Sequence, residues 1–378
     1  MSKVEELLEK YNPDGVEDLT LGEICLNHDS KRRPISKGNR IPGNIPYYGA
    51  NGIQDYVDDY LFNGEYILVG EDGSVITEEG TPIVKWVYGK FWVNNHAHIF
   101  SENLNKALLK YVFYILQINK IKDLVRGVPP KLTKESALSI SLKIPHIKVQ
   151  EEIVKILDSF TNLIDALNEE LSLRQKQFEY YREKLLTFDD KSINVNITPL
   201  GEIGNVCMCK RIMRNETNNE GGIPFYKIGT FGGIADSFIS KDKFEEYKNK
   251  YNYPKLGDIL ISASGTIGKT VVFDGKPSYY QDSNIVWIDN DETKVINSFL
   301  RYIYTVIDWK VDDGGVIKRL YNTNIRSTLI TYPKEKAVQQ SIVEKLDAFE
   351  SLISSLKEEI ALRQKQYEYY REKLLTFD

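Results

Sequence analysis

Two stretches of the chain place apolar residues at alternating spacings of four and three. The first runs from Ile153 through Leu157 and Phe160 to Phe188, and the second repeats this pattern from Ile342 to Phe377. Such spacing, sustained over about five heptads, is typical of helices that pair along one apolar seam. At about 1.5 Å per residue, each helix would span roughly 55–60 Å. The pattern therefore predicts two long coiled-coil helices that can pack against each other.

One position in each predicted seam is polar: Arg174 in the first helix and Arg363 in the second. A polar seam residue can fix the register of a coiled coil at a cost in stability. An arginine can also lay its apolar stem along the seam and extend its charged group to the edge. The sequence leaves both interpretations open.

The residues outside these stretches form two blocks with a different pattern. Short runs rich in Ile, Val, Tyr and Phe are separated by Gly, Pro and Asn, which is typical of strands joined by turns. We expect one helix in each block, near Asn105–Asn119 and Asn297–Val306. The predicted fold class is α+β, with two globular blocks alternating with two long helices. The expected bounds are residues 1–148, 149–189, 190–337 and 338–378.

The two halves of the chain are copies of one another. Val149–Asp189 aligns without gaps on Val338–Asp378, with about two-thirds of the positions identical. Shorter matches continue into the blocks, where Leu21–Ile24 returns as Leu200–Ile203. The chain is therefore an internal repeat of a globular block followed by a long helix.

The ends of the two helices match even on their outward faces. Leu173–Asp189 and Leu362–Asp378 differ only at Phe178 against Tyr367. A solvated face usually tolerates substitution, and exposed tyrosine beside arginine suits an interface. We expect one kind of partner to bind both copies, although a recent duplication would also explain the identity. The candidate partner-binding residues are Gln175, Tyr180, Arg182, Gln364, Tyr369 and Arg371.

Composition narrows the class of protein further. The chain has 378 residues, 42% hydrophobic and 27% charged, with a formal charge of −5. No apolar run approaches the roughly 18 residues of a membrane span. The acidic, amphipathic start does not resemble a secretory signal, and three cysteines without framework spacing suit a reducing compartment. We expect a cytoplasmic protein without disulfides.

The order of blocks and helices resembles the specificity subunits of type I restriction-modification systems. The paired ends Leu173–Asp189 and Leu362–Asp378 carry this resemblance, together with the junctions Ile144–Val154 and Tyr332–Val343. This chain lacks the second proline and the glutamate that typical members have at these junctions. The resemblance covers essentially the whole chain.

The resemblance implies an architecture and a function. Two target-recognition domains would alternate with two helices packed as an antiparallel pair, with pseudo-twofold symmetry. Each domain would read half of a bipartite, asymmetric DNA target, and the helices would set the gap. Two DNA adenine methyltransferase subunits, which use S-adenosylmethionine, would dock on the helices, and restriction subunits could join through them. The chain itself would need no cofactor and would not be an enzyme.

A reader of DNA needs cations for phosphates and polar groups for base edges. A basic cluster lies ten residues after Leu21 and recurs ten residues after Leu200, although solvated loop charge would look the same. A second equivalent pair of segments leads to a short helix that Thr133 or Asn322 could cap, a geometry able to hold phosphate. The candidate DNA-binding residues are Lys31, Arg32, Arg33, Lys37, Arg40, Arg126 and Lys131 in the first block, and Lys210, Arg211, Arg214, Lys269, Lys318 and Arg319 in the second.

Two further loops follow matching strands in the two blocks. Gly70–Ser74 and Ser262–Thr266 differ in sequence, as base-reading loops should, although ordinary hairpin turns would also differ. We leave both interpretations open.

Other motifs carry little weight. Ala263–Thr270 matches a relaxed phosphate-binding loop, but a strand is predicted after it where an ATPase needs a helix. His96 and His98 lack the paired spacing of a zinc site, as do Cys207 and Cys209, so no metal site is expected. The main alternative is a coiled-coil scaffold with protein-binding arms, which would show no salt-dependent affinity for DNA.

Overall fold

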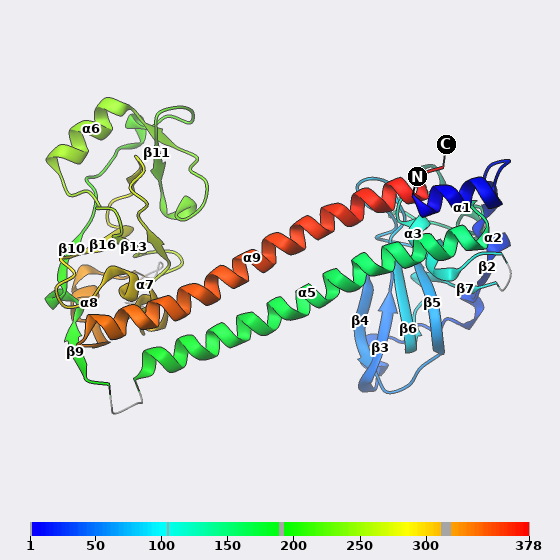
Figure 1. Ribbon diagram of the computed structural model, residues 1–378, viewed down its shortest axis with the longest axis horizontal. Helices are drawn as coiled ribbons and strands as arrows, with labels where there is room; N and C mark the ends of the chain where they lie inside the picture. Colours follow the sequence, from blue (N-terminus) through cyan, green and yellow to red (C-terminus); the bar gives the residue numbers. More distant parts are fainter. Residues whose placement is uncertain (1, 104–105, 189–192, 311–318, 378) are drawn as a thin grey trace. The chain divides into compact units, whose positions relative to one another are not determined.

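The structure is a computed structural model that describes residues 2–103, 106–188, 193–310 and 319–377 (Figure 1). The chain divides into two compact units, residues 1–169 with 358–378, and residues 170–357. Each unit holds one globular domain, the half of a long helix that adjoins this domain, and the distal half of the other long helix. Among the described residues, no helix is both long and apolar enough to cross a bilayer.

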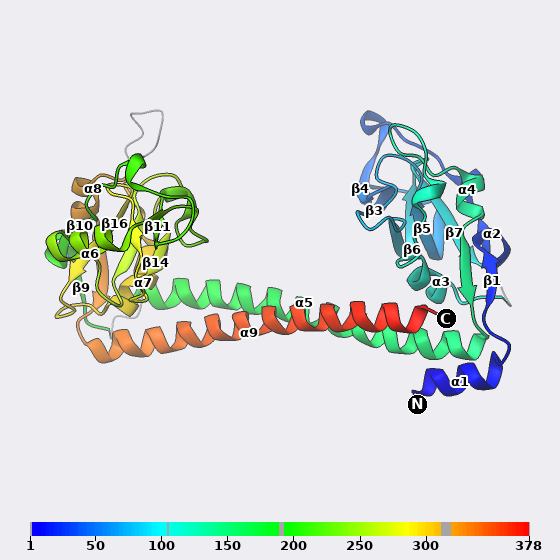
Figure 2. The same cartoon turned by 90° about the horizontal axis from the view of Figure 1, so that it is seen from above.

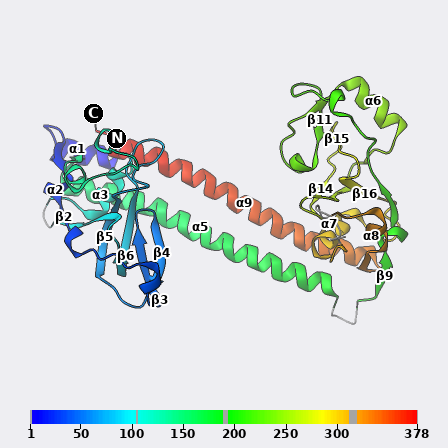
Figure 3. The same cartoon turned by 180° about the vertical axis from the view of Figure 1, so that it is seen from behind.

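The first unit is built on a six-stranded sheet in the order β2-β7-β5-β6-β3-β4, whose last four strands lie side by side in Figure 3. Neighbouring strands are antiparallel except β3 and β6, which are parallel. The strands are β2 (Cys25–Asn27), β3 (Pro42–Gly49), β4 (Gly52–Val57), β5 (Phe62–Gly70), β6 (Val84–Val93) and β7 (Ala97–Glu102).

Side chains alternate between the two faces of this sheet, as the period of a strand requires. Along β5, Ile67 and Val69 join the core under helix α3 (Leu109–Leu116), whereas Leu68 joins a smaller core on the opposite face. Figure 2 shows α3 between the sheet and the start of the long helix α5 (Ile147–Thr187). The central sheet is therefore buried on both sides.

The second unit repeats this plan with shorter strands. Its sheet has the order β10-β16-β13-β14, and a three-stranded sheet, β12-β11-β15, lies beside it. Ile259 and Ile261 of β13 face the core under helix α7, whereas Leu260 faces an aromatic core with Trp287. The elements are β10 (Gly204–Cys207), β11 (Ile223–Tyr226), β12 (Phe238–Ile239), β13 (Ile259–Ser262), β14 (Thr270–Val272), β15 (Tyr279–Tyr280), β16 (Ile285–Asn290), α6 (Lys241–Lys250) and α7 (Asn297–Val306).

A short strand pair closes each domain where the chain enters its long helix. β1 (Glu17–Thr20) pairs with β8 (Ser141–Ile144), and β9 (Val195–Pro199) pairs with β17 (Leu329–Pro333), both antiparallel. The remaining helices are α1 (Lys3–Tyr11), α2 (Leu21–Ile24), α4 (Lys134–Leu138), α8 (Asn322–Ser327) and the second long helix, α9 (Lys336–Leu375). The α+β repeat predicted from the sequence is confirmed.

The two long helices run antiparallel within each unit. In the first unit, Phe160 near the start of α5 stacks on Tyr370 near the end of α9, with ring centroids 5.4 Å apart. In the second unit, Tyr181 of α5 stacks on Phe349 of α9 at 5.5 Å. These four residues hold equivalent places in the repeat, so the same aromatic contact forms twice along the seam.

The polar seam residues bind to their own helices. Arg174 Nε donates to Glu170 Oε1 at 2.8 Å, and its Nη1 donates to Gln177 at 2.9 Å. Arg363 makes the same two contacts one repeat later, with Nε 2.7 Å from Glu359 Oε1. Both arginines extend to the polar edge of the seam, which favours the second of the two interpretations left open by the sequence.

A buried glutamine fixes each junction between domain and helix. Gln150 accepts a hydrogen bond from Leu108 N at 2.9 Å and donates to Pro145 O at 2.8 Å. Gln339 accepts from Ile296 N at 2.9 Å and donates to Pro333 O at 2.7 Å. Each glutamine therefore satisfies backbone groups at the start of one helix, α3 or α7, and at the end of a strand.

Candidate nucleic-acid interface

Four segments of the first domain meet at one end of its sheet. They are residues 28–33 after β2, 71–73 after β5, 96–98 at the start of β7, and 126–132 before α4. Leu132 N donates to Glu71 O at 2.8 Å, and Gly73 N donates to Pro130 O at 3.2 Å. The segments therefore form one surface, although up to about a hundred residues separate them in sequence.

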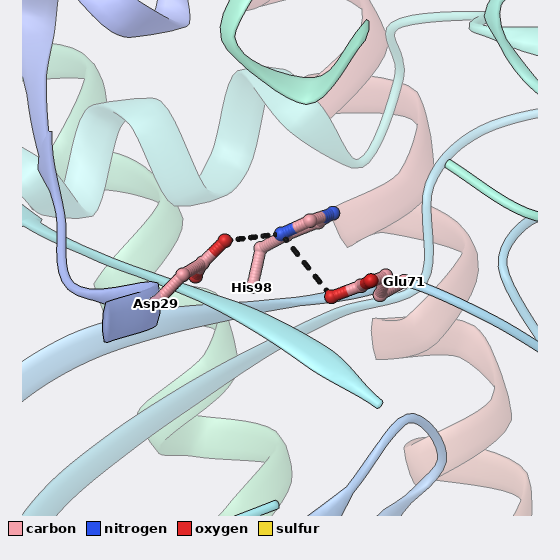
Figure 4. A group of neighbouring side chains, drawn as sticks. All are labelled: Asp29, Glu71 and His98. Carbon is pink, nitrogen blue, oxygen red and sulfur yellow. Dashed lines mark hydrogen bonds and ion pairs between the residues drawn. The ribbon is translucent and has the colours of Figure 1, made fainter. Parts of the chain in front are cut away.

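A buried charged cluster lies beneath this surface, and Figure 4 shows three of its members. His98 Nδ1 is 2.7 Å from Asp29 Oδ2 and 3.7 Å from Glu71 Oε2. Asp29 Oδ1 also accepts a hydrogen bond from Ile99 N at 3.0 Å. Burial alone would raise the pKa of Asp29, but the hydrogen bond and charge of His98, the Ile99 amide and Arg32 outweigh it and lower the pKa.

Arg32, predicted from the sequence as a DNA contact, belongs to this cluster. Its guanidinium binds Glu71, lies 3.5 Å from Asp29 Oδ2, and donates to Ala97 O at 2.9 Å. The side chain is only 14% exposed. Through these hydrogen bonds and ion pairs, the guanidinium of Arg32 joins the segments after β2, after β5 and at the start of β7.

Arg40 is also held inside the first domain. Its guanidinium stacks over Tyr47 at 4.3 Å and pairs with Asp55 at 3.0 Å, and the side chain is 15% exposed. The structure thus places Arg40, predicted from the sequence as a DNA contact, among the enclosed cations of the domain. Its contacts order the segment between β2 and β3.

The remaining basic candidates of the first domain are exposed. Arg33 is anchored through its backbone, since its carbonyl accepts from Trp92 Nε1 at 2.6 Å, while its side chain faces solvent. Lys131 is half-exposed and lies 3.3 Å from Glu71. The exposed candidates are Lys31, Arg33, Lys37, Arg126 and Lys131.

A small loop carries two of these cations. Arg126 and Lys131 exchange backbone hydrogen bonds of 3.0 and 2.8 Å, which close the loop between them. Val128 at its tip is fully exposed. The loop therefore presents an apolar tip between two basic side chains.

The second domain brings the equivalent segments together with different side chains. Leu320 N donates to Ala263 O at 2.9 Å, the counterpart of the bond from Leu132 to Glu71. Asn284 stands where the first domain has His96, since Ala263 N donates to Asn284 O as Glu71 N donates to His96 O. The Oδ1 of Asn284 accepts from Ser264 Oγ at 2.9 Å and Arg319 Nη2 at 3.1 Å. The register of the strands places the apolar Val286 at the position of His98, so the second domain has no counterpart of that buried ion pair there.

The basic candidates of the second domain lie around this network. Arg211 is 64% exposed and pairs with Asp282 at 2.8 Å, and Arg214 is exposed. Lys210 lies 5.2 Å over the ring of Tyr251. Arg319 is partly buried by its contact with Asn284. Lys318 lies outside the described residues.

The loop that resembled a phosphate-binding loop has another structure. Thr270–Val272 forms strand β14, as expected from the sequence, and Lys269 Nζ donates to Phe231 O at 2.5 Å. An ATPase loop would instead open a helix. Lys269, a candidate DNA-binding residue, is exposed and makes this bond within its own domain.

The two predicted helix caps differ. Thr133 caps α4 through its side chain, which accepts from Ser136 N at 3.2 Å. The prediction for Asn322 is wrong, because α8 begins at Asn322 and Tyr321 is its N-cap, without a side-chain cap bond. Both helices are too short for their ends to define an anion site.

The charged cluster also has the composition of a metal site. Single ligand atoms of Asp29, Glu71 and His98 lie within 4.8 Å of one another. However, the guanidinium of Arg32 contacts both carboxylates and already supplies positive charge there. The arrangement favours an ion-paired network over a bound cation.

The predicted partner surface is partly outward-facing. Tyr180 and Tyr369 are 58% and 60% exposed at equivalent positions, and Gln175 and Gln364 are exposed as well. Arg371 of α9 instead donates to Gln117 of the first globular domain, within the same unit, at 2.8 Å. The side chains of Arg182 and Arg371 are partly buried, so their prediction as outward residues is corrected.

Comparison with known proteins identifies the family. The chain matches the type I restriction modification DNA specificity domain twice, over residues 13–173 and 193–362. It is 49% identical to a type I restriction enzyme specificity subunit of Haemophilus influenzae, covering 99% of this chain and 98% of that protein. It is 30% identical to the EcoR124I/EcoR124II specificity subunit of Escherichia coli, covering 100% and 97%. The chain belongs to the family of type I restriction-modification specificity subunits.

A solved structure supports the fold. The S subunit of a type I restriction-modification system from M. genitalium matches with a TM-score of 0.65 over 95% of this chain and 96% of that one. Its sequence identity is 16%, so this likeness concerns the fold alone.

Sequence reasoning missed the residues that organise the interface. Asp29, Glu71 and His98 come from distant segments, and no local motif links them. Gln150 and Gln339 were detectable in principle, because both repeats place a glutamine at the same position of the junction.

Proposed function

We propose that each globular domain reads one half of a bipartite, asymmetric DNA target. Residues of about 17–148 would read one half-site and residues of about 198–337 the other. One observation carries the proposal: equivalent segments converge in both domains, joined by equivalent backbone bonds, but their side chains differ. If the backbone arrangement is the same in both domains and the side chains differ, the two domains can contact different bases in the same way.

The exposed cations around these segments would contact phosphates. Lys31, Arg33 and Arg126 in the first domain, and Lys210 and Arg214 in the second, are exposed at the domain surface. Such contacts position a protein on DNA without reading sequence. Base discrimination then falls to the polar groups between them.

The long helices would set the gap and dock partners. DNA advances about 34–36 Å per turn, so helices of this length would hold two readers on the order of one to one and a half turns apart. The repeated exposed face around Tyr180 and Tyr369 would bind two DNA adenine methyltransferase subunits, and restriction subunits would join through them. Methylation and cleavage would reside in those partners, with S-adenosylmethionine held by the methyltransferase. We expect the assembly in the cytoplasm.

Selection of bound sites from a random duplex library tests the proposal. The chain would be co-expressed with the methyltransferase encoded beside it, and the assembled complex would be used. Recovery of two unlike short motifs at a fixed gap is the expected result. A folded, assembled complex that enriches no motif would contradict the proposal and leave a protein-binding scaffold as the better account.

A further inference from the structure

The loop between Arg126 and Lys131 is a narrow projection of the candidate interface. Arg126 N donates to Lys131 O at 3.0 Å and Lys131 N donates to Arg126 O at 2.8 Å, so the two stems of the loop form a hydrogen-bonded pair. The loop is also tied to the segment after β5, because Gly73 N donates to Pro130 O at 3.2 Å. Pro129 and Pro130 restrict the backbone further. Backbone hydrogen bonds and proline therefore fix the position of the tip.

The tip of this loop has no side chain that can read a base by hydrogen bonding. Residues 127–130 carry no polar side chain, and two of the four are prolines, which lack a backbone N–H. Val128 is fully exposed, and Pro129 beside it is exposed as well. Burial of such apolar groups is favourable wherever a partner supplies an apolar surface. In a nucleic acid, the faces of the bases are such a surface.

The two cations at the base of the loop indicate which groove of a duplex the tip fits. Residues of a hydrogen-bonded antiparallel pair have Cα atoms about 5.5 Å apart. The minor groove of B-DNA is about 6 Å wide, and the major groove is about 12 Å wide. A hairpin of this width can bring Arg126 and Lys131 to both backbones of the minor groove at once. Both side chains are exposed, although Lys131 also lies 3.3 Å from Glu71.

We propose that Val128 and Pro129 form a wedge that enters the minor groove at the first half-site and partly unstacks one base step. The inference rests on the proposed function, because it concerns how the first domain engages DNA. Apolar wedges between base steps kink a duplex towards the major groove, and pyrimidine–purine steps are the most easily kinked. The wedge thus selects a deformable step, while the polar groups of the neighbouring segments select bases.

Unstacking measured in the assembled complex tests the inference. The chain with its methyltransferase would be titrated onto duplexes that carry the selected target. In these duplexes 2-aminopurine, whose fluorescence rises on unstacking, would replace in turn each adenine in or beside either half-site. Wild type should raise the fluorescence at one step of the first half-site, and Val128→Ser should abolish this rise. Fluorescence at the second half-site should be the same for both proteins.

Affinity distinguishes the wedge from a phosphate contact. Val128→Ser should weaken binding to the selected target about tenfold, on the scale of losing the burial of one apolar side chain. The dependence of affinity on salt should keep its slope, because this substitution removes no phosphate contact. A changed slope with unchanged fluorescence would overturn the wedge.

Two further variants separate the wedge from a general effect on the domain. Val128→Ile keeps an apolar tip and should retain both the fluorescence rise and the affinity. Tyr88→Ser removes an exposed side chain from the middle of β6, outside the four segments, and should change neither. Because Val128 is fully exposed, Val128→Ser should unfold with the free energy of wild type, which a denaturation curve checks.

Contact with a thymine methyl group is the competing explanation for an apolar tip. Replacement of the thymines of the first half-site by uracil removes this methyl group. With a wedge, the difference in affinity between wild type and Val128→Ser should persist on the uracil duplex. Loss of that difference would overturn the wedge in favour of the methyl contact.

The outcomes also distinguish the wedge from the function on which it rests. A folded, assembled complex that selects no motif would reject the proposed function itself. Selection of two motifs, with equal affinity and equal fluorescence for wild type and Val128→Ser, would overturn the wedge alone.

Discussion

The two domains of this chain reach one backbone arrangement through different chemistry. In the first, a buried network of Asp29, Arg32, Glu71 and His98 joins the segments, whereas in the second Asn284 accepts hydrogen bonds from Ser264 and Arg319. The backbone bonds from Leu132 to Glu71 and from Leu320 to Ala263 are nevertheless equivalent. The comparison shows that the same backbone arrangement can form with different side chains along it.

The largest expected difference between the domains concerns the cost of removing a carboxylate. Asp29→Ala should destabilise the first domain by about 3–5 kcal/mol, because it leaves buried charge and the Ile99 amide without a partner. Asp282→Ala removes a pair whose arginine, Arg211, is exposed to solvent, and should cost roughly 0–1 kcal/mol. Chemical denaturation followed by a probe in each domain would measure both. Equal costs would contradict the contrast between the two networks.

The Asp29 contribution should also depend on pH. Because the pKa of Asp29 is lowered in the folded state, its stabilisation is present above the ordinary carboxyl range and is lost as pH falls through the folded value. The difference in unfolding free energy between wild type and Asp29→Ala should therefore shrink in acid. An acid series of denaturation curves measures it, and a difference that grows towards low pH would contradict this sign.

The shared junctions predict equal effects in the two domains. Gln150→Leu and Gln339→Leu should each cost about 2–4 kcal/mol, since each leaves buried backbone groups unpaired. Gln340→Leu, at an exposed neighbour that binds Glu344, is the matched control and should cost little. Denaturation again measures the cost. A large difference between the first two variants would show that the junctions are not equivalent.

Much of this architecture was predictable from the sequence, because repetition and periodicity are local signals. The apolar positions from Ile153 to Phe188 predicted the long helix α5 and its packed face. Helix α7 lies at the residues where the sequence predicted it. The organisation of the interface was not predictable. The contact between Asp29 and His98 spans 69 residues, and a basic residue in sequence carries no sign of whether it is free, like Arg33, or enclosed, like Arg32.

The exposed cations should produce a smaller, salt-dependent effect in each domain. Arg126→Ala in the first domain and Arg214→Ala in the second should each reduce the salt dependence of DNA binding by about one counterion per lost phosphate contact. Lys276→Ala is the control, because this exposed lysine of the second domain is not among the candidate DNA-binding residues. Affinity measured across a salt series tests this. An unchanged slope for Arg126→Ala would remove that residue from the proposed interface.

The smallest expected effects concern partner docking. Tyr180→Ala and Tyr369→Ala should each weaken methyltransferase binding by about tenfold, because an exposed tyrosine at an interface centre contributes on the order of 1–2 kcal/mol. Titration calorimetry with the isolated methyltransferase measures this loss. Binding that survives the double variant unchanged would place the docking surface elsewhere.

Duplication of one domain tests the central claim most directly. In this variant, the first globular domain replaces the second, and the two long helices are kept. Site selection with the assembled complex should then recover the first motif twice, once on each side of the original gap, and the second motif should disappear. A variant that is folded and assembled but still selects the original asymmetric target would contradict the claim that each domain reads its own half-site.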